Sequence, residues 1–507
     1  MSTGEDRPQG PVRLSEARGR WVLAAMVLGS SLAMIDATIV NVALPRIGAD
    51  FHASLAGLQW TVNAYTLTLA GLILFGGSLG DRYGRRKVFT IGVAWFAVAS
   101  ALCGLAPGIG VLVGARALQG VGGALLAPGS LAIIQASFAP EDRPQAVGAW
   151  SGFAGVAGAI GPFLGGWVIA AAGWRWAFLL NLPLAAVVIL VAARHVPESR
   201  DETEHRGFDV LGAVSVALAL AGVTYALTEA PESGVSPAAV ALAAVLGLTA
   251  GTAFVLVERR RSNGHGPSAM LPVGIFRSGQ FTAVNVVTFI VYGGMGMQFF
   301  LLVVELQVVA GYSPMVAGAS LLPATVLMLL LSSRAGAFAQ RVGPRFPMTA
   351  GLVLAAAGML LTLRIGPHAS YVADVLPATL VFGLGLSATV APLTATVLAT
   401  ADVRHAGVAS GVNNAVARAA GLLAVAGVPP AVGLTGNAYA NPRVFDHGFH
   451  TAMVIATALL AAGAVLTSLT VRDDALRTDQ ATARPECDVN CPVGAPPLEP
   501  GTTPGPT

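Results

Sequence analysis

Charged residues are scarce in this chain of 507 residues, because Asp, Glu, Lys and Arg together make up only 11% of it. Soluble domains carry about 25% charged residues. Hydrophobic residues make up 54%, and the mean hydropathy is +0.70. This shortage of charge over so long a chain excludes a soluble protein and predicts a polytopic membrane protein. The apolar runs are long enough for helices, whereas strands of a membrane barrel alternate over only about ten residues.

Cysteine is also rare, and so are the motifs of enzymes. Three cysteines are too few for a disulfide framework. Cys487 and Cys491 lie in a Pro-rich tail without a companion histidine, so we predict neither a metal nor a cofactor. No histidine falls in the interior of a predicted span, which removes the usual alternative proton relay. The sequence has no Gly-x-x-x-x-Gly-Lys-Ser/Thr loop and no catalytic triad spacing, so we predict no enzyme activity and no nucleic-acid partner.

Fourteen apolar runs are separated by charged or Gly/Pro-rich breaks, and we expect each to be a membrane-spanning helix in an all-α fold. They lie near residues 21–44, 57–79, 88–106, 111–136, 146–171, 176–196, 209–228, 236–257, 281–304, 315–333, 346–364, 372–397, 408–433 and 449–471. An even number of spans places both termini on one side. Most of the 29 basic residues then fall on the side of the termini. The positive-inside rule therefore predicts that both termini are cytoplasmic.

One carboxylate stands inside the first predicted span. Asp36 is surrounded by apolar residues, and a charge at membrane depth is rarely kept for packing alone. Arg116 in the fourth span lies at a similar expected depth, and a buried arginine needs an acceptor. We therefore predict that Arg116 faces Asp36, and that Asp36 binds a proton in one conformation and releases it in another. A static structural ion pair is the alternative interpretation.

Two loops carry the same motif. Gly77-x-x-x-Asp81-Arg82-x-Gly84-Arg85-Arg86 joins spans two and three, and Gly336-x-x-x-Gln340-Arg341-x-Gly343-Pro344-Arg345 joins spans ten and eleven. Two copies of a six-span unit, with spans seven and eight inserted between them, explain this repeat. The predicted division is 1–20 (cytoplasmic segment), 21–196 (first half), 209–257 (two-helix insert), 279–471 (second half) and 472–507 (disordered tail). Such repeats place the binding site between the halves, near the bilayer midplane.

The first of these loops has two interpretations. Its charged residues would form a latch that pairs across the cytoplasmic face in one conformation only. Simple positive-inside topology explains the arginines as well. It does not explain Gly77, Asp81 and Gly84 at fixed spacing, so we favour the latch.

Glycines recur along the fifth span at intervals of three or four residues, which places them on one helical face. They are Gly148, Gly152, Gly155, Gly158, Gly161 and Gly165. Such a face lets two helices approach backbone to backbone, and Pro162 adds a kink. We expect a tight seam that hinges and seals one side of a pathway while the other opens. Ordinary tight packing is the alternative.

Polar side chains within the spans are candidates for substrate contacts, although each could instead form an interhelical hydrogen bond. They are Asn41, Asn63, Tyr65, Gln119, Asn285, Gln298, Glu305, Asn413 and Asn414. Glu305 is the least expected of them, at the outer end of the ninth span. It would either favour cationic substrates in an outer vestibule or be solvated at the interface.

The region from about residue 20 to 471 resembles the major facilitator superfamily, and specifically its 14-span drug:proton antiporter branch. Four strings carry the resemblance: Leu32 to Pro45, Gly77 to Lys87, Arg116 to Ala124, and Gly158 to Gly166. The second string marks the superfamily, and the other three point to drug antiporters.

The resemblance implies proton-driven export of hydrophobic compounds, cationic ones included, through the cytoplasmic membrane by alternating access. It implies that Asp36 carries the proton and that Arg116 modulates it. In this family the string that holds Gly158, Gly161, Pro162, Gly165 and Gly166 separates antiporters from symporters. A nutrient symporter of the same fold is the first alternative, and a non-transporting membrane sensor is the second.

Overall fold

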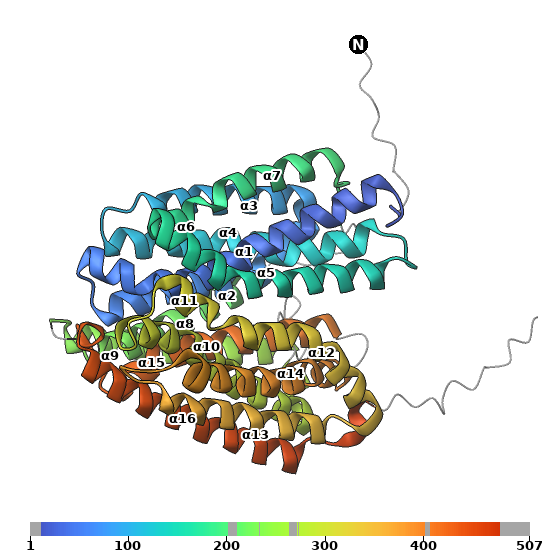
Figure 1. Cartoon of the computed structure of the whole chain (residues 1–507). Helices are drawn as coiled ribbons and strands as arrows, with labels where there is room; N and C mark the ends of the chain where they lie inside the picture. The colour runs from blue at the N-terminus through green and yellow to red at the C-terminus, as the bar shows by residue number, and fades with distance from the viewer. Residues whose placement is uncertain are drawn as a thin grey trace, which may run out of the picture.

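The computed structural model describes residues 12–200, 210–232, 234–262, 271, 273–400 and 406–476, and these are helical almost throughout (Figure 1). Within these ranges the extended pairing is one isolated bridge between Val12 and Phe138. Cys487, Cys491 and nearly all of the predicted tail lie outside the described residues, as does most of the predicted segment 1–20.

The helices form two groups of similar size and an additional pair. The first group consists of α1 (Ala17–Phe51), α2 (Leu55–Tyr83), α3 (Arg85–Gly104), α4 (Ile109–Ser137), α5 (Arg143–Ala172), α6 (Arg175–Leu179) and α7 (Asn181–His195). The pair is α8 (Val210–Glu229) and α9 (Pro237–Ser262). The second group consists of α10 (Gly279–Val308), α11 (Pro314–Ala319), α12 (Leu322–Val342), α13 (Arg345–Leu361), α14 (Leu376–Ala399), α15 (Ala406–Ala431) and α16 (Pro442–Thr470). Short helical turns occur at η1 (Val273–Arg277), η2 (Thr362–Arg364), η3 (Tyr371–Val375), η5 (Ala438–Ala440) and η6 (Asp473–Leu476).

Thirteen stretches of the described chain are helical, long and apolar enough to cross a membrane, and α2 brings the number to fourteen if its two parts, bent by 50°, form one span. Each coincides with one predicted span, so the all-α membrane fold is confirmed. The prediction of the last span was wrong at its start. Because α16 begins at Pro442 and not near 449, His447 and His450 lie within this helix.

Hydroxyl and amide side chains define several helix starts. Ser54 accepts a hydrogen bond from the backbone of Gly57 at the start of α2, and Ser278 does so from Phe281 at the start of α10. Such caps satisfy backbone N–H groups that have no partner within the helix. Prolines inside α1, α4, α5 and α14 are tolerated, as is common where neighbouring helices satisfy the freed backbone groups.

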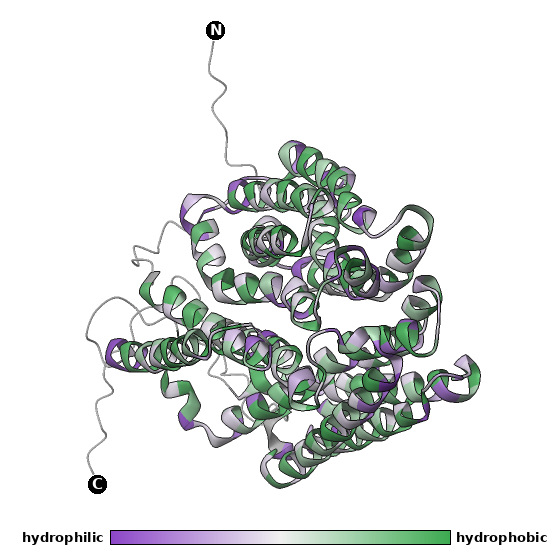
Figure 2. Cartoon of the chain, turned by 90° about the vertical axis from the view of Figure 1, so that its left-hand side faces the viewer, coloured by the Kyte–Doolittle hydropathy of each residue, from purple (hydrophilic) through white to green (hydrophobic). Residues whose placement is uncertain are grey.

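The two groups meet along a seam. α1 packs on α5 and α7 in its own group and on α10 in the other, α5 packs on α11 and α12, and α2 packs on α15. Figure 2 views the molecule along the helices, with the two groups above and below and hydrophobic residues on their outward faces. We call the end that holds the α2–α3 and α12–α13 connections the basic end, and the opposite end the far end.

The inserted pair braces the seam and is not a peripheral addition. α8 contacts both α2 and α15. At the far end the indole of Trp60 donates to Glu229 at 2.6 Å. The backbone N–H of Gly436 donates to Glu232 at 3.0 Å, and the backbone of Leu55 donates to Gly436 at 2.7 Å. The connection between α8 and α9 therefore ties the two groups together.

The first repeated loop turns at a glycine and is held by a carboxylate. Gly84 has a φ of +110°, a conformation that favours glycine. Glu198, directly after α7, accepts the backbone N–H groups of Arg86 at 3.0 Å and Lys87 at 3.2 Å. A carboxylate at the start of α3 satisfies free N–H groups and complements the helix dipole.

The second half repeats this arrangement. Gly343 has a φ of +96°, and Asp473, directly after α16, accepts the backbone N–H of Arg345 at 3.2 Å. Each half thus uses the chain after its last helix to cap its third helix. The sequence repeat predicts the glycines, but it does not reveal the two carboxylates.

Candidate functional site

Asp36 and Arg116 meet in the interior of the first half, as their depths predict. The Arg116 guanidinium lies 2.6 Å from the Asp36 carboxylate, and the two side chains are 1% and 0% exposed. Breaking a buried pair of this kind is strongly destabilising, because the remaining charge has no partner. The ion pair between Asp36 and Arg116 is therefore either permanent or broken only when the conformation changes.

Two amides complete the coordination of the Asp36 carboxylate. Gln119 donates to it at 2.7 Å and Asn181 donates to it at 2.9 Å. Both amides also donate to the hydroxyl of Ser100, at 2.7 and 3.1 Å. With Arg116, three donors face one carboxylate, which stabilises its ionised form. Sequence reasoning missed Asn181 and Ser100; the only signal was a polar residue in the apolar run before Pro183.

Arg116 is fixed by further contacts on its other side. Its Nε donates to the backbone carbonyl of Thr61 at 3.0 Å, and its guanidinium also donates to Gln119 at 2.6 Å. The ring of Tyr65 lies 4.3 Å from the guanidinium carbon, a cation–π distance. Tyr65 and Gln119, which we had proposed as substrate contacts, are thus buried parts of this cluster. We call Asp36, Arg116, Gln119, Asn181 and Ser100 the Asp36 cluster.

The polar residues of α10 and α15 form a second, smaller network. Asn413 donates to Thr288 at 2.7 Å and lies 3.4 Å from the side-chain oxygen of Asn285. Asn285 also donates to its own helix, and exposed Asn414 does the same. The interhelical alternative therefore describes Asn285 and Asn413 in this conformation.

Three other candidates carry buried amide atoms without partners. Neither side-chain atom of Asn63 or Gln298 has a hydrogen-bond partner within the described residues, and the same holds for the side-chain oxygen of Asn41. They belong to α2, α10 and α1, and α1 contacts both other helices. Buried amides without partners are costly and mark positions where a ligand or water completes the bonding.

The glycines of α5 divide into two sets. A Cβ on Gly165 would lie 2.8 Å from Ile39 of α1, and one on Gly166 would lie 2.5 Å from the backbone of Pro314 in α11. Gly161 is equally crowded by α1. In contrast, Gly152 and Gly158 have no neighbouring atom within 4 Å of such a Cβ. In this conformation only the far half of the stripe is packed, and Gly158 lies in the half where a Cβ would have no close neighbour. The role of the stripe as a hinging seam stays a prediction.

Hydrogen bonds between the two groups also lie at the far end. Gln59 donates to the backbone of Val425 at 2.5 Å, and Gln307 donates to the backbone of Val42 at 3.1 Å. Tyr439 donates to the backbone of Gly48 at 2.9 Å. The groups are thus joined by hydrogen bonds at the far end. In the basic half of α5, Gly148, Gly152 and Gly158 have open space where a Cβ would lie.

Comparisons with known proteins agree with this architecture. The sequence model of the Major Facilitator Superfamily matches residues 26–425. The chain belongs to the major facilitator superfamily. It is a multi-pass membrane protein from a family of transporters that move small substrates.

Two relatives of the superfamily are similar over most of their length. The multidrug resistance protein Stp of Mycobacterium tuberculosis is 35% identical, over 78% of this chain and 72% of Stp. The puromycin resistance protein pur8 of Streptomyces alboniger is 35% identical, over 82% of each chain. A solved structure, a bacterial homologue of the human lysosomal transporter Spinster in an inward-facing and unoccupied conformation, has a TM-score of 0.64 at 18% identity. It matches 92% of this chain and 100% of that one. This last likeness establishes the fold alone.

The superfamily loop pairs within its own half in this conformation. Arg85 lies 2.8 Å from Asp81 across the turn at Gly84, and Arg86 lies 3.7 Å from Glu198. Arg86 also donates to the backbone carbonyl of Val196 at 3.1 Å. Pairing of these two arginines across the basic end, as the latch interpretation requires, belongs to a conformation closed at that end and stays a prediction.

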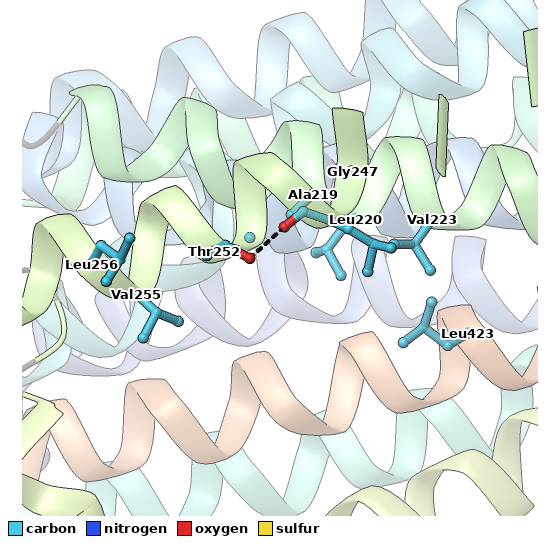
Figure 3. A pocket seen from close by; sticks show the side chains of 10 residues that line it. Ala219, Leu220, Val223, Gly247, Thr252, Val255, Leu256 and Leu423 are labelled. Atoms are coloured by element: carbon cyan, nitrogen blue, oxygen red, sulfur yellow. Dashed lines mark hydrogen bonds between the residues drawn. The ribbon is translucent and has the colours of Figure 1, made fainter. Parts of the chain in front are cut away.

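A groove of about 470 Å³ lies between α8, α9 and Leu423 of α15. Figure 3 shows that its lining is apolar except for Thr252, whose hydroxyl donates to the carbonyl of Leu248 at 2.8 Å. The groove therefore offers no free polar group to orient a ligand, and we do not place the transported substrate there.

Glu305 is neither solvated nor part of an open vestibule in this conformation. Its side chain is 0% exposed, and it faces α16 within the second half. In this conformation α10 continues past Glu305 to Val308, and the packing of α16 against α10 buries the side chain. A contact of Glu305 with cationic substrates stays a prediction.

Proposed function

We propose that this protein exports small hydrophobic compounds, cationic ones included, in exchange for protons through the cytoplasmic membrane by alternating access. The observation that carries the proposal is the Asp36 cluster, buried in one of two halves that are hydrogen-bonded to each other at the far end. The names of Stp and pur8, resistance proteins for multiple drugs and for puromycin, support this class of substrate.

The orientation follows from charge. The basic end carries Arg82, Arg85, Arg86 and Lys87 of the first loop, and Arg341 and Arg345 of the second. Positive charge near membrane spans is retained on the cytoplasmic side. We therefore place the basic end and both termini in the cytoplasm, so that the conformation described here is open inward.

In this conformation Asp36 is ionised and held by Arg116, Gln119 and Asn181. Substrate enters from the cytoplasm past Gly152 and Gly158. It then reaches the buried amides without partners, which are those of Asn41, Asn63 and Gln298. Opening at the far end then lets a proton neutralise Asp36, which weakens its hold on Arg116, and the substrate leaves. Each proton that returns inward supplies about 2.3 kcal/mol per 100 mV of membrane potential.

Ethidium efflux from energised cells tests this proposal. We expect the wild type to lose its efflux on addition of a protonophore, and Asp36→Asn to be inactive without one. Asp50→Asn is the matched control, because Asp50 forms an exposed ion pair with Arg175 at the far end and exposed pairs contribute little.

Wild-type efflux that survives the protonophore would overturn the coupling. Ethidium that accumulates in energised cells would identify a symporter. Equal efflux by the wild type and Asp36→Asn would remove Asp36 from the mechanism.

A further inference from the structure

A second buried carboxylate lies in the other half of the molecule and has no role in the mechanism above. Both side-chain oxygens of Glu305 are buried, and neither has a hydrogen-bond donor among the described residues. A carboxylate in such a position is costly unless it is neutralised. The buried carboxylate of Asp36 is stabilised by three hydrogen-bond donors. Glu305 has no such donors among the described residues, so it must be neutralised in another way.

The group that faces Glu305 is another carboxyl. Asp446 lies on α16, which packs against α10, and it is close enough to Glu305 for the two carboxyl groups to share a hydrogen bond. One oxygen of Asp446 is also buried without a donor. Two carboxylates in contact cannot both be ionised at neutral pH, whereas one proton between them supplies the missing donor.

A route from the surface leads through a histidine. His450, one turn after Asp446 on α16, lies with its Nδ1 3.9 Å from the Asp446 carboxylate. Its Nε2 is 2.9 Å from the carbonyl of Ile365, and a carbonyl only accepts, so Nε2 carries a hydrogen. Neutral His450 therefore turns a free Nδ1 lone pair toward Asp446.

Exposure decreases along this route. The side chains of His450 and Asp446 are 32% and 27% exposed, and Glu305 is 0% exposed. The 3.9 Å gap exceeds a hydrogen bond, so transfer needs a small rotation or one bridging water.

Three other charged or titratable groups at the far end of the second half are engaged elsewhere. Arg364 pairs with Asp374 at 3.4 Å. Tyr312 donates to the backbone of Ala369, and Tyr439 donates to Gly48. The described residues also contain no group of three His, Cys, Asp or Glu that could hold a metal ion. A proton is the ligand that this geometry fits.

We propose that Glu305 and Asp446 share one proton, exchanged with the far-end surface through His450, and that this pair is a second proton-binding site separate from the Asp36 cluster. With the far end outside, the site samples extracellular pH while the seam is closed. It stands in the half of the molecule that lacks Asp36.

Infrared difference spectroscopy of the purified full-length protein tests this assignment. The measurement follows the C=O band of protonated carboxyl groups on a step from neutral to high pH, in an Asp36→Asn background. We expect Glu305→Gln to abolish the band and Asp446→Asn to shift it, because the shared hydrogen bond is lost. Asp50→Asn should leave it unchanged. A band that survives both Glu305→Gln and Asp446→Asn would overturn the proposal.

The route is tested separately. His450→Gln keeps a donor for Ile365 but cannot take up a proton, so release from the pair after a pH step should slow on the order of a hundredfold. An unchanged release rate would overturn the role of His450. These measurements need no transported substrate, so their outcome is distinguishable from a failure of the export proposal.

Discussion

At the scale of single residues, the two buried acids of this protein are stabilised in opposite ways. Asp36 receives three donors, from Arg116, Gln119 and Asn181, in a fully buried site. Glu305 faces only another carboxyl. The difference lies in the partners and not in the depth, because both side chains are 0% exposed.

Asn181 should act as a positioning residue for Asp36. We expect Asn181→Ala to lower the free energy of unfolding by about 1–3 kcal/mol, because Ser100 and the carboxylate each lose a buried donor. Ethidium efflux should fall with it, since the carboxylate is no longer held in place. Thermal unfolding and efflux assays on the same variant check both effects.

The control for this prediction is Asn437→Ala, at an exposed position in the far-end loop. It should leave both the unfolding temperature and the efflux near their wild-type values. If Asn181→Ala behaves like this control, Asn181 neither stabilises the protein nor positions Asp36.

At the scale of elements, α5 changes its role along its length. Its far part contacts α1 and α11 so closely that a Cβ on Gly166 would collide with the backbone of Pro314. Its basic part has no close neighbour at Gly148, Gly152 or Gly158. One helix is thus closely packed in its far part and has open space at three glycines of its basic part.

The same substitution at two glycines of α5 should have opposite effects on stability. Gly166→Ala should lower the unfolding temperature, because the α5–α11 contact must separate to admit the methyl group. Gly152→Ala should leave it unchanged or raise it, since alanine favours the helix by up to about 1 kcal/mol where space is open. Differential scanning calorimetry of both purified variants measures this contrast.

Equal destabilisation by the two substitutions would mean that both parts of α5 are packed. In that case the molecule would be closed at the basic end as well, contrary to the arrangement of the described residues.

At the scale of the whole molecule, the two halves share a structural device that their sequences only partly reveal. Glu198 caps α3, and Asp473 caps α13, each from the chain directly after the last helix of its half. The device anchors the end of each half to its repeated loop. The α8–α9 insert adds a third connection, because its Glu229 accepts from Trp60 of the first half and its Glu232 accepts from Gly436 of the second.

Removal of each cap should lower the free energy of unfolding by a similar amount, and the two effects should be independent. Glu198→Ala and Asp473→Ala should each lower the free energy of unfolding by about 0.5–2 kcal/mol, the range for lost helix caps. They lie in different halves and share no partner, so their effects should add in the double variant. Chemical denaturation of the two single variants and the double variant measures this.

A strongly non-additive double variant would mean that the two caps interact. That would place the two halves in contact at the basic end, where the open glycines of α5 lie.

Much of this protein is determined by its sequence alone. Hydropathy locates the thirteen candidate spans and the bent helix α2, because each segment must satisfy its own backbone polar groups in lipid. The depth of Asp36 and Arg116 predicts their pairing, because two lone charges in one membrane layer have few other partners. The motif repeat predicts the two halves and the turn glycines Gly84 and Gly343.

Only the tertiary structure decides which side chains meet across helices. Asn181, Glu198 and Asp473 acquire their contacts from the rotation and packing of whole helices, which no local pattern encodes. The same holds for Glu305, because its partner Asp446 lies on a helix far along the chain. The glycine stripe of α5 permits close packing along its full length, and the conformation determines which half uses it. A chain that alternates between two conformations carries the sequence for both, and the physical contacts of one conformation cannot be read from it.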